Sequence, residues 1–203
     1  MRLSRAFFAR PALEVAPELL GCRLVHELEG ERLEGLIVEV EAYLGDGSDA
    51  ASHAHRGFTP RAASMFGPPG RFYVYRSMGI HACANLVCEA EGRASAVLLR
   101  AVEPVLGLER MARRRGGRGG RELASGPGKL AQAFGIGLEH DGANALRGAL
   151  RVEAARRAPP GQVLRGPRVG IRKAAELPYR FWLAGSEHVT RTPLNRRAIM
   201  RSR

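Results

Sequence analysis

The chain has 203 residues, 45% of them hydrophobic, and its 32 Lys and Arg against 20 Asp and Glu give a net charge of +12 at pH 7. This length suits a single domain with a core of its own. No apolar run reaches about 18 residues, so we expect no membrane span. The apolar stretches of the N-terminus are interrupted by charged residues and proline, so we expect no signal peptide. The odd number and the spacing of the three cysteines indicate reduced thiols in an intracellular protein. We therefore expect it in the cytoplasm or nucleoid of a bacterium, or in the nucleus of a eukaryote.

The positive charge is carried almost entirely by arginine, since Lys129 and Lys173 are the only lysines. A GC-rich genome would explain the preference for arginine over lysine, but not the excess of positive charge. Such an excess indicates a polyanionic partner, most often nucleic acid. A solvated basic surface is the alternative.

In chain order, the pattern first predicts a short helix over 11–21, ended by Gly21, and then two strands over 22–29 and 33–44. A long loop rich in glycine and proline follows over 45–70, and loops of this length are often functional. The remaining elements are strands over 71–79, 81–90 and 94–102, helices over 104–115 and 125–136, and strands around 162–172 and 179–184.

Strands and helices do not alternate regularly along the chain, which argues against a doubly wound parallel sheet. We therefore expect an α+β fold, with a mainly antiparallel curved sheet and flanking helices. One domain is expected to span residues 1–203, with less ordered termini.

The predicted strand over 33–44 carries acidic and aromatic residues in an apolar run. Strand alternation places four side chains on one face and three on the other. The first set is Ile37, Glu39, Glu41 and Tyr43, and the second is Val38, Val40 and Ala42. The strand is either half-buried with an acidic wet face, or it presents a general base and an aromatic platform to a substrate.

Several common site chemistries have no support in the sequence. Neither a phosphate-binding P-loop nor a dinucleotide-binding glycine motif is present. The pairs HAH (53–55) and HAC (81–83) are weak evidence for zinc, and GPGK (126–129) is weak evidence for phosphate binding at a helix start. We therefore expect neither a metal nor a cofactor.

The remaining motifs follow one another in a definite order. They are EVEAYLG (39–45), DAASHAHRG (49–57), TPRAASMFGPPG (59–70), FYVY (72–75), ACANL (82–86), AVLLRAVEP (96–104) and SGPGKL (125–130). Together they closely resemble the motifs of the alkyladenine DNA glycosylases, also called 3-methyladenine or methylpurine DNA glycosylases. The resemblance covers about residues 13–136, and RVGI (168–171) with PYRFW (178–182) extends it to about residue 184.

The resemblance implies an enzyme that flips an alkylated or deaminated purine out of duplex DNA and hydrolyses its N-glycosidic bond. It assigns Glu41 as the general base that activates the attacking water. Arg100 and the main-chain carbonyl of Val169 would help to hold that water. Glu39 has no such role in the family, so we expect a solvated or paired carboxylate there.

The resemblance also implies the walls of the base pocket. Tyr43 would lie on one side of the flipped purine and His53 and Tyr75 on the other, where electron-rich rings attract a cationic base. Asn85 would crowd the 2-amino group of normal guanine, and the main-chain N–H of His53 would bind the purine 6-position. Two further pocket residues are implied, namely Ala51 and Leu98.

The sequence departs from the family pattern at two points. One residue more than in some members lies between Gly45 and Asp49. Met78 stands where the family commonly has a tyrosine that fills the gap left by the flipped base. It is either the wedge here or a buried strand residue.

The resemblance and the basic composition together predict double-stranded DNA with a damaged purine as the partner of a monomer. The expected phosphate contacts are Arg61, Lys129, Arg113, Arg114, Arg115, Arg118 and Arg121. Five of these lie within 113–121, which we expect to be a flexible arm over the phosphates.

Two alternatives belong to other functional classes. A basic, non-catalytic DNA-binding or architectural protein would explain the charge, but not the ordered motifs. A metal-dependent nuclease would use Glu39, Glu41 and Asp49 as a carboxylate cluster.

Overall fold

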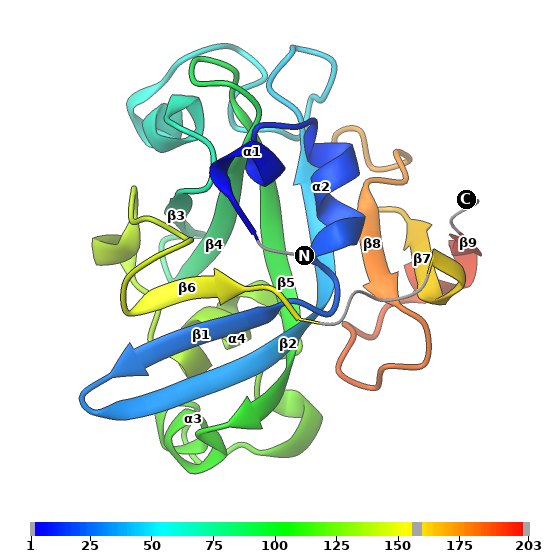
Figure 1. Cartoon of the computed structure of the whole chain (residues 1–203). Helices are drawn as coiled ribbons and strands as arrows, with labels where there is room; N and C mark the ends of the chain where they lie inside the picture. The colour runs from blue at the N-terminus through cyan, green and yellow to red at the C-terminus, as the bar shows by residue number, and fades with distance from the viewer. Residues whose placement is uncertain (1–2, 156–159, 201–203) are drawn as a thin grey trace.

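The computed structural model describes residues 3–155 and 160–200, so the expectation about the chain ends falls partly outside the described residues (Figure 1). Its strands form one sheet in the order β3-β4-β5-β2-β8-β7-β9, with β1 pairing with β2 and β6 pairing with β1. Every pairing between these strands is antiparallel, which confirms the α+β prediction.

The strands are β1 (Arg23–Leu28), β2 (Glu31–Tyr43), β3 (Phe72–Ser77), β4 (His81–Cys88), β5 (Ser95–Leu106), β6 (Leu150–Glu153), β7 (Val163–Gly166), β8 (Arg180–Leu183) and β9 (Ile199–Met200). The α-helices are α1 (Arg5–Phe8), α2 (Ala12–Leu19), α3 (Leu108–Arg114) and α4 (Pro127–Phe134). Short 3₁₀ turns are η1 (Pro60–Phe66), η2 (Gly120–Glu122), η3 (Leu138–His140), η4 (Pro160–Gln162) and η5 (Pro193–Arg197).

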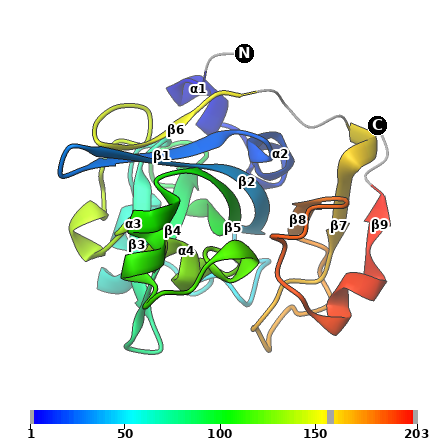
Figure 2. The ribbon, with the colours of Figure 1, turned by 90° about the horizontal axis from the view of Figure 1, so that it is seen from below.

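Strand β2 organises the sheet because it changes its partner along one edge. Its first half, 31–36, pairs with β1, and 39–41 pair with β8, while β5 follows its other edge. The view from below shows the result, with β7, β8 and β9 set apart from β1 and β6 (Figure 2). The partner change brings β8 and the loop before it beside the end of β2.

An irregularity at this point corrects the predicted alternation. The register of β2 against β5 shifts between Ile37 and Glu39, as in a β-bulge. Ile37 therefore joins Val40 and Ala42 in the large hydrophobic core, whereas Val38 packs against Trp182 in a small separate cluster. The prediction that Ile37 shares a face with Glu39 was wrong, because a bulge changes the parity of a strand.

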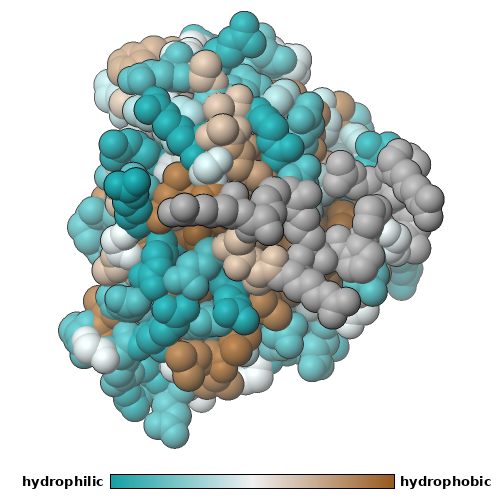
Figure 3. Space-filling view, viewed as in Figure 1, coloured by the Kyte–Doolittle hydropathy of each residue, from teal (hydrophilic) through white to brown (hydrophobic). Residues whose placement is uncertain are grey.

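The large core lies between the sheet and the helices. Helix α2 packs on β2, and α4 packs on β4 and β5. Their buried side chains include Leu19 and Phe134, which are fully covered. The face in Figure 3 is largely hydrophilic, with an apolar area over the end of β5 and the start of α3, where Leu106 and Leu108 are about half exposed.

Three predicted boundaries were wrong. Strand β5 runs to Leu106, through the predicted start of a helix, and Pro104 is accommodated opposite Gly35 where the register shifts. Helix α3 begins only after Gly107, whose φ of 80° breaks the strand. The predicted strand over 162–172 ends at Gly166, since the next residues form a loop.

Other elements were not predicted or were shorter than expected. Helix α1 and strands β6 and β9 carry too few residues for a periodic pattern. Strand β3 ends at Ser77 rather than 79, and the first hairpin turns at Glu29 and Gly30, both with positive φ. No helix within the described residues is long and apolar enough to cross a bilayer. The three cysteines are buried.

Gly45, two residues beyond Tyr43, must remain glycine because a Cβ there would coincide with the backbone carbonyl of Ala94. We expect Gly45→Ala to lower the free energy of unfolding by about 2–3 kcal/mol or more, the cost of forced overpacking. Gly119 has φ −132° and no atom within 4 Å of a built Cβ, so Gly119→Ala is the matched control and should be nearly neutral. Urea denaturation measures both, and equal effects would contradict the packing argument.

Candidate active site

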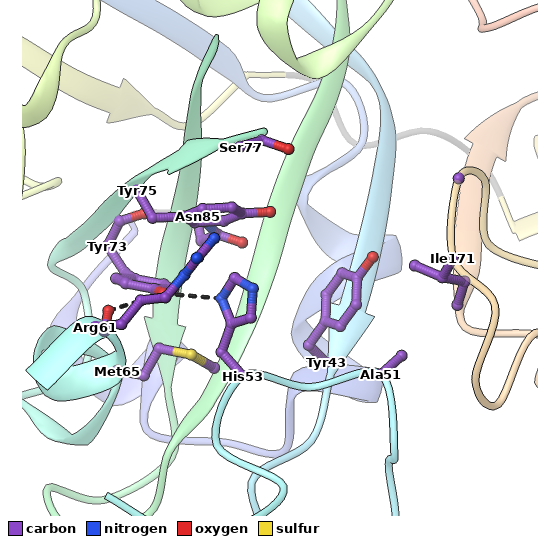
Figure 4. Close-up of a pocket in the computed structure, with 11 residues that line it drawn as sticks. Tyr43, Ala51, His53, Arg61, Met65, Tyr73, Tyr75, Ser77, Asn85 and Ile171 are labelled. Atoms are coloured by element: carbon purple, nitrogen blue, oxygen red, sulfur yellow. Dashed lines mark hydrogen bonds between the residues drawn. The ribbon is translucent and has the colours of Figure 1, made fainter. Parts of the chain in front are cut away.

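A cavity of about 200 Å³ opens between β2, β3, β4 and the long loops on either side of them (Figure 4). Its walls combine aromatic rings with a few polar groups. They are formed by Tyr43, Ala51, His53, Arg61, Met65, Tyr73, Tyr75, Ser77, Asn85, Gly170 and Ile171. Most of the predicted pocket residues therefore meet around one cavity.

Aromatic rings face each other across this cavity. His53, Tyr73 and Tyr75 lie together on one side, and Tyr43 stands on the other, beside Ile171 (Figure 4). The rings of His53 and Tyr75 meet edge to face at 4.5 Å, and Tyr73 and Tyr75 are stacked at 5.5 Å. A planar group between Tyr43 and His53 would contact ring surfaces on both sides.

The proton position on His53 follows from its hydrogen bonds. Its Nδ1 lies 2.9 Å from the hydroxyl of Tyr73, which donates its own proton to the carbonyl of Arg61 at 3.1 Å. Nδ1 must therefore carry the proton and donate it to Tyr73. Burial, with the nearby charge of Arg61, lowers the pKa of His53, so the ring is neutral at pH 7. Burial also raises the pKa of Tyr73 to about 12.

Glu41 is fully buried beside the cavity and accepts hydrogen bonds from three donors. One oxygen, Oε2, accepts from the Tyr43 hydroxyl at 2.8 Å and from Arg100 at 3.3 Å, and Oε1 accepts from the main-chain N–H of Val169 at 2.7 Å. Burial, followed by the charge of Glu41, raises the pKa of Tyr43 well above its usual range, so the phenol keeps its proton. The contact with Val169 is made by its N–H, and the prediction for its carbonyl stays a prediction.

Glu39 is a paired carboxylate. It accepts from Arg100 at 3.1 Å, from Arg180 at 2.6 Å and from the N–H of Thr190 at 2.7 Å. Burial raises its pKa, but Arg100 and Arg180 outweigh burial and hold it below the usual value. Arg100 thus lies between two carboxylates, which fixes the guanidinium beside Glu41.

Asp49 forms an ion pair with Arg168, a residue that the sequence motifs did not single out. Arg168 contacts both Asp49 oxygens, at 2.6 and 2.7 Å, and places its guanidinium carbon 4.6 Å from the centre of the Tyr43 ring. The two residues are 119 positions apart, so no periodicity could have paired them; the only signal was that Arg168 stands in the RVGI motif beside Val169.

These ion pairs leave no support for the nuclease alternative. Glu39, Glu41 and Asp49 each bind an arginine, and the described residues hold no group of three or more His, Cys, Asp or Glu side chains arranged for a metal. The acidic cluster seen in the sequence is therefore neutralised by arginines.

The other predicted pocket residues lie around the same centre. Asn85 is buried, lines the cavity and donates to the carbonyl of Tyr73 at 3.0 Å. Leu98 pairs in register with both Glu41 and Asn85, on the strand between them, but it is not one of the residues that line the cavity.

Met78 lies at the tip of the β3–β4 hairpin with 82% of its surface exposed. The turn closes through a 3.0 Å hydrogen bond from Ile80 to Ser77, and both Met78 and Gly79 have the left-handed φ of a type I′ turn. The alternative that Met78 is a buried strand residue was therefore wrong.

The segment 113–121 is not a free arm. Arg115 is buried and donates to the carbonyls of Leu123 and Glu122, so its prediction as a phosphate contact was wrong; it ties the end of α3 to the next turn. Arg121 donates to the carbonyl of Glu187 at 3.1 Å.

Two more of the predicted phosphate contacts are held by neighbouring residues. Arg118 donates to Arg115, and Lys129 is paired with Glu122. Arg113 remains well exposed at the end of α3 beside Arg114. Arg61 lies at the cavity, over the ring of Tyr75.

Comparison with known proteins agrees with this geometry. The family model described as "Methylpurine-DNA glycosylase" matches residues 6–187. Relatives named "Putative 3-methyladenine DNA glycosylase" include one from Rhodopseudomonas palustris strain BisB18, 52% identical over 94% of this chain and 91% of its own length, and one from Methanoculleus marisnigri, 49% identical over 94% of this chain and 100% of its own. A third, from Chlorobaculum tepidum, is 47% identical over 94% of this chain and 91% of its own.

The family match spans the whole site, from Glu41 on β2 to Val169 and the strand β8 behind it. The charged centre and the aromatic cavity therefore lie within the matched region. The chain belongs to the methylpurine-DNA glycosylase family and is a monofunctional DNA glycosylase.

Proposed function

We propose that this chain removes alkylated or deaminated purines, of the 3-methyladenine, 7-methylguanine, hypoxanthine and ethenoadenine class, from double-stranded DNA. The observation that carries the proposal is a fully buried carboxylate, Glu41, held by three donors beside a cavity walled by aromatic rings. A base inside a duplex could not reach this cavity, so the nucleotide must flip out of the stack.

The cavity suits a flat, electron-poor base. A cationic purine between Tyr43 and His53 gains cation–π attraction, worth about 0.5–2 kcal/mol, while a neutral purine gains stacking alone. The positive charge also makes the base a better leaving group, so binding and chemistry favour the same lesions. Asn85, fixed by its bond to Tyr73, would crowd the 2-amino group of guanine.

Hydrolysis then needs one water and one base. The water oxygen forms a bond to C1′ of the sugar, the N-glycosidic bond breaks, and its electron pair leaves with the purine. The proton of the water passes to Glu41, whose charge also stabilises the cationic sugar.

The hydrogen bonds indicate which Glu41 oxygen takes the proton. A carboxylate oxygen can accept about two hydrogen bonds. Oε2 already accepts from Tyr43 and Arg100, whereas Oε1 accepts only from Val169. Oε1 therefore keeps a free position for the water.

Met78 is proposed as the wedge that fills the gap left by the flipped nucleotide. Its side chain is exposed at the tip of a tight hairpin next to the cavity-lining Ser77. An apolar side chain inserted into the stack offsets part of the cost of flipping.

Glu41→Gln should abolish base release while binding to lesion-containing DNA stays near normal, because an amide fills the same space but cannot accept the proton. We expect the single-turnover excision rate to fall by about 100-fold or more, the usual scale for a lost general base. Release of the base from a duplex with one alkylated purine, followed by alkaline cleavage, measures it. An unchanged rate would remove Glu41 from the mechanism.

Glu39→Gln should act mainly on stability, since it leaves the buried Arg180 without its carboxylate. We expect the free energy of unfolding to fall by about 3–5 kcal/mol, the cost of breaking a buried ion pair. Glu41→Gln should cost less, because Arg100 keeps Glu39 as a partner. Urea denaturation of both variants measures the two free energies of unfolding. A larger loss of stability in Glu41→Gln than in Glu39→Gln would contradict this division of roles.

His53 should make the preference for cationic bases depend on pH. Its lowered pKa keeps the ring neutral at pH 7, and protonation in acid places a positive charge against the base. Because the pKa of His53 is lowered, we expect the ratio of 3-methyladenine to hypoxanthine excision to stay constant above about pH 6.5 and to fall as the pH drops below that value. His53→Gln is the control that should flatten this dependence, and an equal pH dependence in both proteins would refute the role of His53.

A further inference from the structure

Arg168 joins the three segments that build the pocket. Its side chain is fully buried and contacts both oxygens of Asp49, in the loop that also carries His53. It donates to the carbonyl of Ala42 on β2 at 3.0 Å and to that of Ala174, in its own loop, at 3.3 Å. Displacing this guanidinium would remove the contacts through which it ties these three segments together.

The guanidinium also supports the platform for the base. Its central carbon lies 4.6 Å from the ring centre of Tyr43 and 5.3 Å from that of Tyr179. Arg168 does not line the cavity, whereas Tyr43 does, so Arg168 covers the face of the Tyr43 ring that points away from the cavity. The ring is held from behind by a flat, charged group.

Arg168 also directly precedes a residue that orients Glu41, the proposed general base. The next residue, Val169, donates its N–H to Glu41 at 2.7 Å. Any movement of the Arg168 backbone therefore moves a donor to Glu41. One arginine thus positions both the stacking wall and the carboxylate.

We propose that Arg168 is a positioning residue for excision, which fixes Tyr43 and Glu41 together, and that its pairing with Asp49 lets the Tyr43 ring accept a cationic purine. The inference rests on the proposed function. A bare positive charge behind the ring would repel a cationic base on the other side. Asp49, at hydrogen-bonding distance from both terminal nitrogens of the guanidinium, neutralises that charge.

Lysine cannot replace Arg168 in this position. A guanidinium is planar, binds a carboxylate with two parallel donors and stacks on aromatic rings, whereas an ammonium is a compact, strongly hydrated charge. Arg168→Lys keeps the charge but loses the flat contact with Tyr43. We expect single-turnover excision of 3-methyladenine and hypoxanthine to fall by about 10-fold or more, with unchanged affinity for lesion-free DNA.

The chain offers a matched control for this substitution. Arg10 also binds a carboxylate with two nitrogens, on Glu18, and lies 4.7 Å from the ring centre of Phe7, away from the cavity. Arg10→Lys should lower stability without changing either excision rate. If Arg168→Lys leaves both rates unchanged, or Arg10→Lys lowers them as much, the positioning role is overturned.

A second pair of variants tests the charge. Asp49→Asn should lower the ratio of 3-methyladenine to hypoxanthine excision by about threefold or more, the scale of a lost cation–π attraction. The double variant Asp49→Asn with Arg168→Gln removes both charges and should restore the ratio, although both rates stay low. An unchanged ratio in Asp49→Asn overturns the role of Asp49.

The wild-type protein separates this inference from the proposed function. Excision by the wild type together with normal rates in Arg168→Lys would leave the function intact and refute Arg168. Absence of excision of either lesion by the wild type would refute the proposed function itself.

Discussion

Burying an ion is tolerated only where an ion of opposite charge lies beside it, and this constraint organises the centre of the protein. Three carboxylates and three guanidiniums are buried together around the end of β2. They are Glu39, Glu41, Asp49, Arg100, Arg168 and Arg180. Their charges balance, and Arg100 bridges two of the carboxylates. Glu41 can thus stay buried next to an aromatic cavity because its neighbours supply the compensating charge.

The six groups come from distant parts of the chain. Glu39 pairs with Arg180 across 141 positions, and Asp49 with Arg168 across 119. The partner change along β2 makes this possible, because it seats β8 against residues 39–41 just where the carboxylates lie. This buried charged centre is therefore a product of the complete sheet, and no single hairpin contains it.

Much of the site could be predicted from local patterns. The resemblance of the ordered motifs pointed to Glu41, Tyr43 and Asn85, and the sequence pattern predicted strands close to β4 and β5. Features that depend on contacts between distant residues could not be predicted. These are the bulge that places Ile37 on the other face of β2 and the ion pair between Asp49 and Arg168. The role of Arg115 could not be predicted for the same reason. In the sequence it is one of several basic residues in a run, whereas in the fold its guanidinium donates to two main-chain carbonyls.

The wedge role proposed for Met78 at the hairpin tip has a consequence for how fast the enzyme would search DNA. A side chain that must order itself on each encounter loses conformational entropy at every site it samples. Met78 is already locked in a left-handed turn closed by a hydrogen bond, so most of its backbone ordering was completed when the chain folded. The left-handed conformation costs a residue with a side chain about 1–2 kcal/mol, stored in the native state. In the wedge role proposed for Met78, such a rigid tip would test one base step after another without refolding.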